Sequence, residues 1–205
     1  MHYGERFNGY THLAGAILAA AGATTLITLA AQKGDAMRIV SFSIYGAALF
    51  LLYLVSTMYH GMRGRAKDVF RKLDHVAIYV MIAGTYTPFS LVTLNGAWGW
   101  TMFGAIWGLA AFGIVQELCI ARGARVLSLL IYLLMGWLAL IALVPLWRAL
   151  SWSGMAWVVG GGLIYTVGIV FYVYDERFRH WHGIWHLFVM AGSAVHFTAI
   201  MLFVA

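Results

Sequence analysis

The sequence has one cysteine, two prolines and few charged residues, and each shortage excludes a class of protein. With Cys119 alone, neither an intramolecular disulfide nor a cluster of cysteine ligands can form, so any metal site must use His, Asp or Glu. Only 10% of the 205 residues are charged, whereas 63% are hydrophobic. That balance is typical of a polytopic membrane protein and excludes an ordinary soluble domain.

What the sequence does have is long apolar runs separated by short polar connections. A window of about 19 residues predicts helices near 10–31, 39–60, 74–94, 99–119, 126–147, 154–174 and 182–204. Seven crossings of about 20 residues each use most of the chain. We therefore expect an all-α fold with seven transmembrane helices, in which residues 1–205 form a single domain. The first run is too long for a signal-peptide core and is interpreted as a retained helix.

The positive charges indicate the orientation of these helices. Segments on the side of the N-terminus hold ten Lys and Arg residues: Arg6, Arg63, Arg65, Lys67, Arg71, Lys72, Arg122, Arg125, Arg177 and Arg179. The other side holds three: Lys33, Arg38 and Arg148. Because positive loops face the cytoplasm, we expect a cytoplasmic N-terminus and an outside C-terminus. The net charge of +6 then reflects membrane orientation and not binding of nucleic acid.

Under this topology, the polar residues of several helices lie at one cytoplasmic level. Ser56 and His60 end the second helix, Asp74 opens the third, and His182 and His186 open the seventh. Residues four apart share a helix face, so His182 and His186 can bind one ion. With His60, they would form a zinc site with one position left for water, which Asp74 could hold.

Glu5, Asn8 and His12 precede or open the first helix at the same level. The alternative is that the histidines only hydrogen bond across helices or lie in headgroup water. The cluster favours a metal, because each ionisable group inside a membrane costs about 2.5 kcal/mol or more. His196 lies about 15 Å further along the seventh helix, too far to share the ion. We interpret it as a buried hydrogen-bonding residue.

Glu117, near the inner end of the fourth helix, is interpreted as an ion-pair partner of Arg122 or Arg125. For an acidic residue at that depth, a structural ion pair is a simpler explanation than a catalytic role. We therefore leave Glu117 out of the expected site.

Four motifs resemble those of one known family. They are Glu5-x-x-Asn8-x-x-x-His12-x-x-Gly15, Ser56-x-x-x-His60, Lys72-Leu73-Asp74 followed by Gly84-Thr85-Tyr86-Thr87-Pro88, and His182-x-x-x-His186 followed by His196. Together they span nearly the whole chain, and the chain resembles the hemolysin III branch of the progestin and adipoQ receptor (PAQR) family. That family is related to the adiponectin receptors and to alkaline ceramidase-like membrane hydrolases. The resemblance implies zinc held by His60, His182 and His186, with Asp74 reached through the zinc-bound water and Ser56 nearby.

Three functions remain open at this point. The first is a zinc-dependent hydrolase of membrane lipid amides or esters, with Asp74 as general base and Ser56 steadying the oxyanion. The second is a non-enzymatic sensor or regulator of membrane lipid state and fluidity, with a structural zinc. The third is a cytolytic pore, which we rank last because the sequence has no strand pattern for a β-barrel.

The expected partners follow from these functions. They are membrane lipids, with no nucleic acid, and a homo-oligomer remains open. The compact chain resembles the bacterial hemolysin III proteins, which implies a multi-pass protein of the bacterial inner (plasma) membrane. Zinc is favoured over iron, nickel or copper only by ligand type, since all of these bind imidazole.

Overall fold

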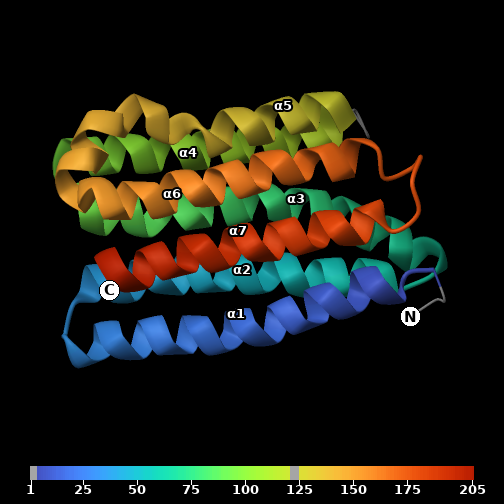
Figure 1. The fold of residues 1–205 in the computed structure, drawn as a ribbon, viewed down its shortest axis with the longest axis horizontal. Coiled ribbons are helices and arrows are strands. Elements are labelled where there is room, and N and C mark those ends of the chain that lie inside the picture. Colours follow the sequence, from blue (N-terminus) through green and yellow to red (C-terminus); the bar gives the residue numbers. More distant parts are fainter. Residues whose placement is uncertain (1–3, 121–124) are drawn as a thin grey trace.

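A computed structural model describes residues 4–120 and 125–205, and every regular element in these ranges is a helix. The helices lie side by side along one axis (Figure 1). They are α1 Arg6–Gln32, α2 Ala36–Gly61, α3 Gly64–Pro88, the π-helix η1 Phe89–Leu94, α4 Gly96–Val115, the π-helix η2 Gln116–Ile120, α5 Arg125–Gly136, the 3-10 helix η3 Leu138–Ala142, α6 Leu143–Val173 and α7 Trp181–Phe203. The predicted all-α class is confirmed for the described part of the chain.

Within the described ranges, six continuous helical stretches are long and apolar enough to cross a membrane. The longest covers residues 125–173, which is 49 residues, and includes both the predicted fifth and sixth helices. Its backbone leaves helical geometry at Ser151, with φ 60° and ψ −178°, inside the connection predicted between them. Figure 1 shows α5 and the later part of α6 extending along the same axis of the bundle, with the chain reversing between them.

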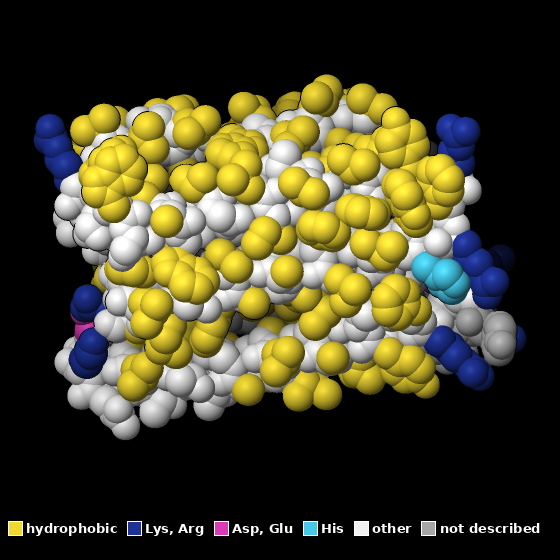
Figure 2. Space-filling model, in the orientation of Figure 1, with side chains coloured by type: hydrophobic (Ala, Val, Ile, Leu, Met, Phe, Trp, Pro, Cys, Tyr) yellow, Lys and Arg dark blue, Asp and Glu magenta, His cyan; other side chains and the backbone are white. Residues whose placement is uncertain are grey.

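The surface of the bundle is apolar around its middle and charged at its ends. Large hydrophobic side chains point outward, and Ile17 and Val126 are 65% and 72% exposed. Figure 2 shows these side chains over the middle of the visible face, with Lys and Arg at the two ends. Such a belt matches the hydrocarbon core of a bilayer. The arrangement is that of a multi-pass membrane protein.

Small residues allow the first three helices to pack closely. α2 packs between α1 and α3. A Cβ added at Gly46 of α2 would lie 2.4 Å from the Cβ of Ala23 in α1, and one at Gly84 of α3 would lie 2.5 Å from that of Ala48 in α2. These contacts are the close backbone approaches by which helices associate in lipid. They fix α2, which carries His60, against both neighbours.

The largest differences from the predicted extents concern α3, the predicted fifth helix and α6, which begins at Leu143 and not near 154. α3 begins at Gly64, ten residues before the predicted start, because Arg, Lys and Leu are good helix formers in water while hydropathy detects only the membrane part. The predicted fifth helix is interrupted after Gly136 by the 3-10 helix η3. No glycine–proline pair or charge marks that break within the apolar run.

The end of α7 remote from the polar cluster is held by the connection between α1 and α2. Lys33 Nζ donates to the carbonyl oxygen of Ala205 at 2.7 Å, and Arg38 Nε donates to that of Val204 at 2.9 Å. Asp35 caps α2 by accepting from the backbone N–H of Arg38, and this bond lowers the pKa of the Asp35 carboxyl. Cations at the carboxyl end of a helix also complement its dipole.

Candidate metal centre

Three histidines from two helices converge at the opposite end of the bundle. His60 comes from the last turn of α2, and His182 and His186 come from the first turns of α7. One ring nitrogen from each lies within 4.8 Å of those of the other two. The ring centroids are 4.7 to 5.1 Å apart. The expected trio is therefore brought together, and its residues could hold a metal ion.

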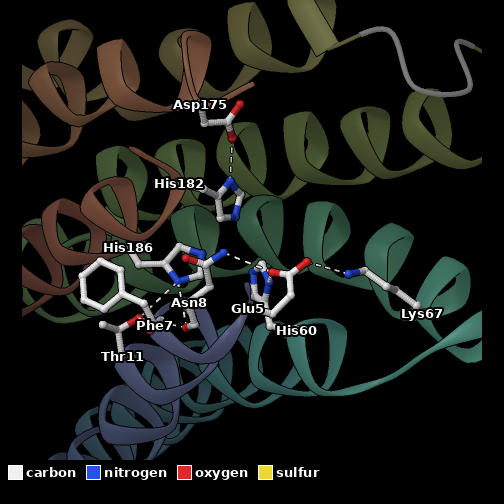
Figure 3. A network of polar contacts seen from close by, with 9 residues as sticks. All are labelled: Glu5, Phe7, Asn8, Thr11, His60, Lys67, Asp175, His182 and His186. Atoms are coloured by element: carbon white, nitrogen blue, oxygen red, sulfur yellow. Dashed lines mark hydrogen bonds and ion pairs between the residues drawn. The ribbon is translucent and has the colours of Figure 1, made fainter. Parts of the chain in front are cut away.

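Each of these imidazoles is oriented by a partner at its Nδ1 atom (Figure 3). Nδ1 of His60 lies 2.7 Å from Oε2 of Glu5, and Nδ1 of His182 lies 2.6 Å from Oδ2 of Asp175. Nδ1 of His186 lies 3.1 Å from the backbone oxygen of Asn8. Carboxylate or carbonyl partners behind histidine ligands are a recurrent feature of metal sites, because they fix the ring and its tautomer.

The two carboxylates are held in their ionised form. The pKa of Glu5 lies well below its ordinary value, chiefly because of the hydrogen bond with His60 and then that with Lys67. Burial raises the pKa of Asp175, but hydrogen bonds from His182 and Arg125 outweigh it and lower the pKa overall. Both groups are therefore acceptors at neutral pH.

These partners determine which ring nitrogen can bind a metal. An ionised carboxylate or a backbone oxygen only accepts hydrogen bonds, so each of the three rings donates from Nδ1, and in the neutral imidazole the lone pair is then on Nε2. Nε2 of His60 and Nε2 of His182 are buried and have no hydrogen-bond partner among the described residues. Buried polar atoms are usually satisfied. Three imidazole nitrogens that converge in this way could hold a metal ion.

His12 lies directly behind one member of the trio. Its ring stacks on that of His186 with centroids 3.6 Å apart and planes at 12°, and Tyr53 contacts its edge. The side chain is 4% exposed, and neither ring nitrogen has a partner among the described residues. Its role was not predicted. The stacking helps to fix the plane of the His186 ring.

Asp74 and Ser56 line the same cavity as the histidines. Asp74 is close enough to His60 and His182 for an electrostatic interaction with both. The Ser56 side chain is 1% exposed and lies beside Asp74, but its hydroxyl makes no hydrogen bond of normal geometry. Both predicted residues therefore line the cavity that holds the histidines, and the Ser56 hydroxyl has unused hydrogen-bonding capacity.

Glu117 belongs to a separate polar cluster. It hydrogen bonds to Nδ1 of His75 at 2.8 Å and accepts from Ser128 at 2.6 Å. The expected partner Arg125 instead pairs with Asp175 at 2.7 Å, and Arg122 lies outside the described residues. The difference arises because η2 turns Glu117 toward α3 and α5, whereas Arg125 reaches the end of α6.

A cavity of about 660 Å³ contains the metal centre and continues into the bundle. This volume lies within the range of small-molecule sites, about 300 to 1,000 Å³. Beyond the histidines, its wall includes Leu52, Ile82, Leu133 and Val189. Glu176 also lines it, and its side chain is 87% exposed, so the cavity reaches the surface at the histidine end. The space is polar at one end and largely apolar inside.

The residue that sequence reasoning missed is Asp175. It lies in the connection between α6 and α7, seven residues before His182. A loop carries no periodicity that reveals which way a side chain points. The only available signal was an acidic residue shortly before a histidine pair. Glu5 and Asn8 were placed at the correct level, but their contacts with His60 and His186 could not be derived.

Comparisons with known proteins agree with this architecture. The family model described as "Haemolysin-III related" matches residues 2–197. Hemolysin-3 of Bacillus cereus is 42% identical over 201 residues, covering 98% of this chain and 91% of that protein. The Hemolysin-3 homolog of Bacillus subtilis (strain 168) is 43% identical over 200 residues, covering 97% and 93%. Monocyte to macrophage differentiation factor of Homo sapiens is 30% identical over 204 residues, covering 97% and 83%.

Proposed function

The chain belongs to the haemolysin-III-related family, and from that premise we propose that it is a zinc-dependent hydrolase of membrane lipid amides or esters. One observation carries the proposal: ring nitrogens of three histidines converge at the polar end of a largely apolar cavity. Three histidines leave a fourth position of a tetrahedral zinc free, which is the arrangement of catalytic and not of structural zinc sites.

In this proposal, His60, His182 and His186 hold zinc through Nε2, and Glu5, Asp175 and the backbone of Asn8 orient them. Zinc bound there supplies a Lewis acid and lowers the pKa of a water toward about 7. The conclusion that it is zinc rests on the all-imidazole donor set, since Ca²⁺ and Mg²⁺ prefer oxygen ligands.

Asp74 and Ser56 supply the remaining chemistry. Asp74 accepts a proton from the attacking water as its oxygen bonds to the acyl carbon, and the C–N or C–O bond to the leaving group breaks. The leaving amine or alcohol takes up that proton. The Ser56 hydroxyl donates a hydrogen bond to the oxyanion that develops on the acyl oxygen. The Ser56 hydroxyl has the spare hydrogen-bonding capacity that its role requires.

The proposed topology places this chemistry at the cytoplasmic surface of a bacterial inner membrane. The 49-residue stretch 125–173 would measure about 74 Å as one helix, more than twice the hydrocarbon thickness of about 30 Å. With the reversal at Ser151 it crosses twice, so the single domain 1–205 has seven crossings. The positive-inside rule then sets the N-terminus in the cytoplasm.

A lipid fits the cavity better than a water-soluble substrate does. The apolar wall beyond the metal centre accommodates a hydrocarbon chain, while the polar group to be cleaved lies at the histidines. We propose no nucleic-acid partner, because the carboxylates of Glu5, Glu117 and Asp175 line this cavity together with its cationic side chains.

The proposal is tested by measuring whether turnover requires the metal. Purified protein in lipid nanodiscs is assayed for fatty acid release from a panel of lipid amides and esters, after chelation and after addition of zinc. We expect release only in the zinc-loaded state. If chelation lowers the melting temperature and no lipid is cleaved in either state, zinc is structural, and a sensor of membrane state replaces the hydrolase.

The partners of the histidines are expected to set metal affinity. Asp175→Asn and Glu5→Gln each remove a charged acceptor without changing side-chain size, so each should weaken zinc binding by about 10-fold to 100-fold. Competition with a fluorescent zinc chelator measures the change. Asp68→Asn is the matched control, because that side chain is 70% exposed and lies 3.9 Å from its ion-pair partner Arg71. Equal affinity in all three variants would contradict the orienting role.

A further inference from the structure

A second, smaller cavity lies beyond the first. It has a volume of about 70 Å³ and is lined mainly by apolar residues, among them Phe89, Met102 and Leu146. Tyr86, Trp137 and His196 line both cavities. These three large side chains therefore stand between them, and they come from three different parts of the fold: α3, the break after α5, and α7.

Each of the three side chains is fixed by a hydrogen bond to its surroundings. The hydroxyl of Tyr86 donates to the backbone oxygen of Gly136 and accepts from the backbone N–H of Ala139, both at 2.9 Å. Those backbone groups belong to the break between α5 and η3. The interruption of the helix is thus stabilised by the same phenol that separates the cavities, since groups freed from a helix in lipid need another partner.

The other two members are held in the same way. Trp137 Nε1 donates to Oγ1 of Thr166 at 3.2 Å. His196 Nε2 donates to the backbone oxygen of Val158 at 3.0 Å. A Cβ at Gly161 would lie 2.3 Å from the His196 ring, so the ring lies flush against α6. Because each of the three rings is held by a hydrogen bond, together they form a partition between the two cavities.

The position of the partition relates it to the metal centre. His196 lies ten residues along α7 from His186, which is about 15 Å and half of a hydrocarbon core of about 30 Å. A chain whose polar group is at the histidines would therefore meet the partition near the middle of the membrane. We propose that Tyr86, Trp137 and His196 act as a stop that limits the length of the hydrocarbon chain accepted by the large cavity.

This inference rests on the proposed lipid substrate and adds a selectivity to it. Each methylene buried against the apolar wall should raise affinity by about four-fold until the chain reaches the stop. Further methylenes must then fold back or remain outside, so they add nothing. Opening the partition joins the small cavity to the large one and provides room for about two groups of the size of a water molecule.

The test compares the length dependence of binding in variants that open or narrow the passage. The probes are straight-chain fatty acids from decanoic to docosanoic acid, competing with a fluorescent fatty acid on the purified protein. In each protein, the affinity plateau is the chain length beyond which the affinity for fatty acids stops rising. Trp137→Ala removes the indole, and we expect the plateau of this variant to move to chains longer by about two methylenes. Gly162→Leu adds a side chain where a Cβ is 3.9 Å from Trp137, and its plateau should move to shorter chains. Trp157→Ala, at a residue 38% exposed, should leave it unchanged.

The outcomes separate this inference from the proposed function. Binding with the same plateau in the wild type, Trp137→Ala and Gly162→Leu overturns the stop and leaves the hydrolase standing. No binding of any fatty acid overturns both the stop and the lipid substrate. Shifted plateaus in a protein that cleaves no lipid support the stop and count against the hydrolase. Gly162→Leu keeps the test decisive should Trp137→Ala fail to fold.

Discussion

Alanine substitution of His60, His182 or His186 is expected to reduce bound zinc from about one ion per chain to nearly none. Each histidine supplies one of three protein ligands, and two remaining imidazoles do not hold zinc through purification. Elemental analysis of the purified proteins measures the loss. Because the ligands come from α2 and α7, the three variants should also lose the link that the ion makes between these helices.

His196→Ala is the matched control for this series. It removes a buried histidine from the same helix α7, and that ring bonds to the backbone of Val158 rather than to the metal centre. It should therefore keep its zinc even where its stability falls. Stoichiometric zinc in any one of the three ligand variants would remove that histidine from the site. Wild-type protein without metal would return all three to the alternative interpretation, in which they only hydrogen bond between helices.

Asp74→Asn is expected to lower turnover by about 10²-fold to 10⁴-fold, the usual contribution of a general base, while zinc stays bound. The carboxamide has the size of the carboxylate but cannot accept a proton at neutral pH. Initial rates of fatty acid release give the first quantity, and zinc per chain gives the second. The combination separates loss of catalysis from loss of the metal.

A control on the same helix uses the exposed Asp68, whose substitution by asparagine should leave both quantities unchanged. Full turnover in Asp74→Asn would move the proton-accepting role to another group in the cavity, with Glu5 the nearest acidic alternative to His60. A simultaneous loss of zinc and turnover would instead mean that Asp74 helps to hold the metal.

The cluster of three histidines could be predicted because ionisable residues are conspicuous in a membrane-spanning helix. His60, His182 and His186 are costly in an apolar run, they fall at one depth, and the last two share a helix face. The predicted topology was enough to place the end of α2 and the start of α7 at the same depth. The contacts behind the ligands could not be predicted, because Glu5 precedes α1 and Asp175 lies in a connection, where no periodicity fixes the direction of a side chain.

The helical class could also be predicted from the sequence, but the interruptions of the helices could not. Hydropathy identifies an apolar run without distinguishing a continuous helix from one that changes to a 3-10 turn at Leu138. That break depends on the Tyr86 hydroxyl, which arrives from a helix 50 residues earlier in the chain. The early start of α3 was missed for the opposite reason, since a helix in water has no hydropathy signal.

The distribution of the ligands along the chain has a consequence for biosynthesis. His60 ends the second helix and the histidine pair opens the last one, so a growing chain holds only one ligand until α7 emerges from the ribosome. In the proposed zinc-bound protein, the ion can be captured only when the last helix has entered the bilayer and docked beside α1 and α6. In this proposal only a completed bundle binds the ion, and a chain interrupted before residue 182 lacks two of the three histidines that would hold it.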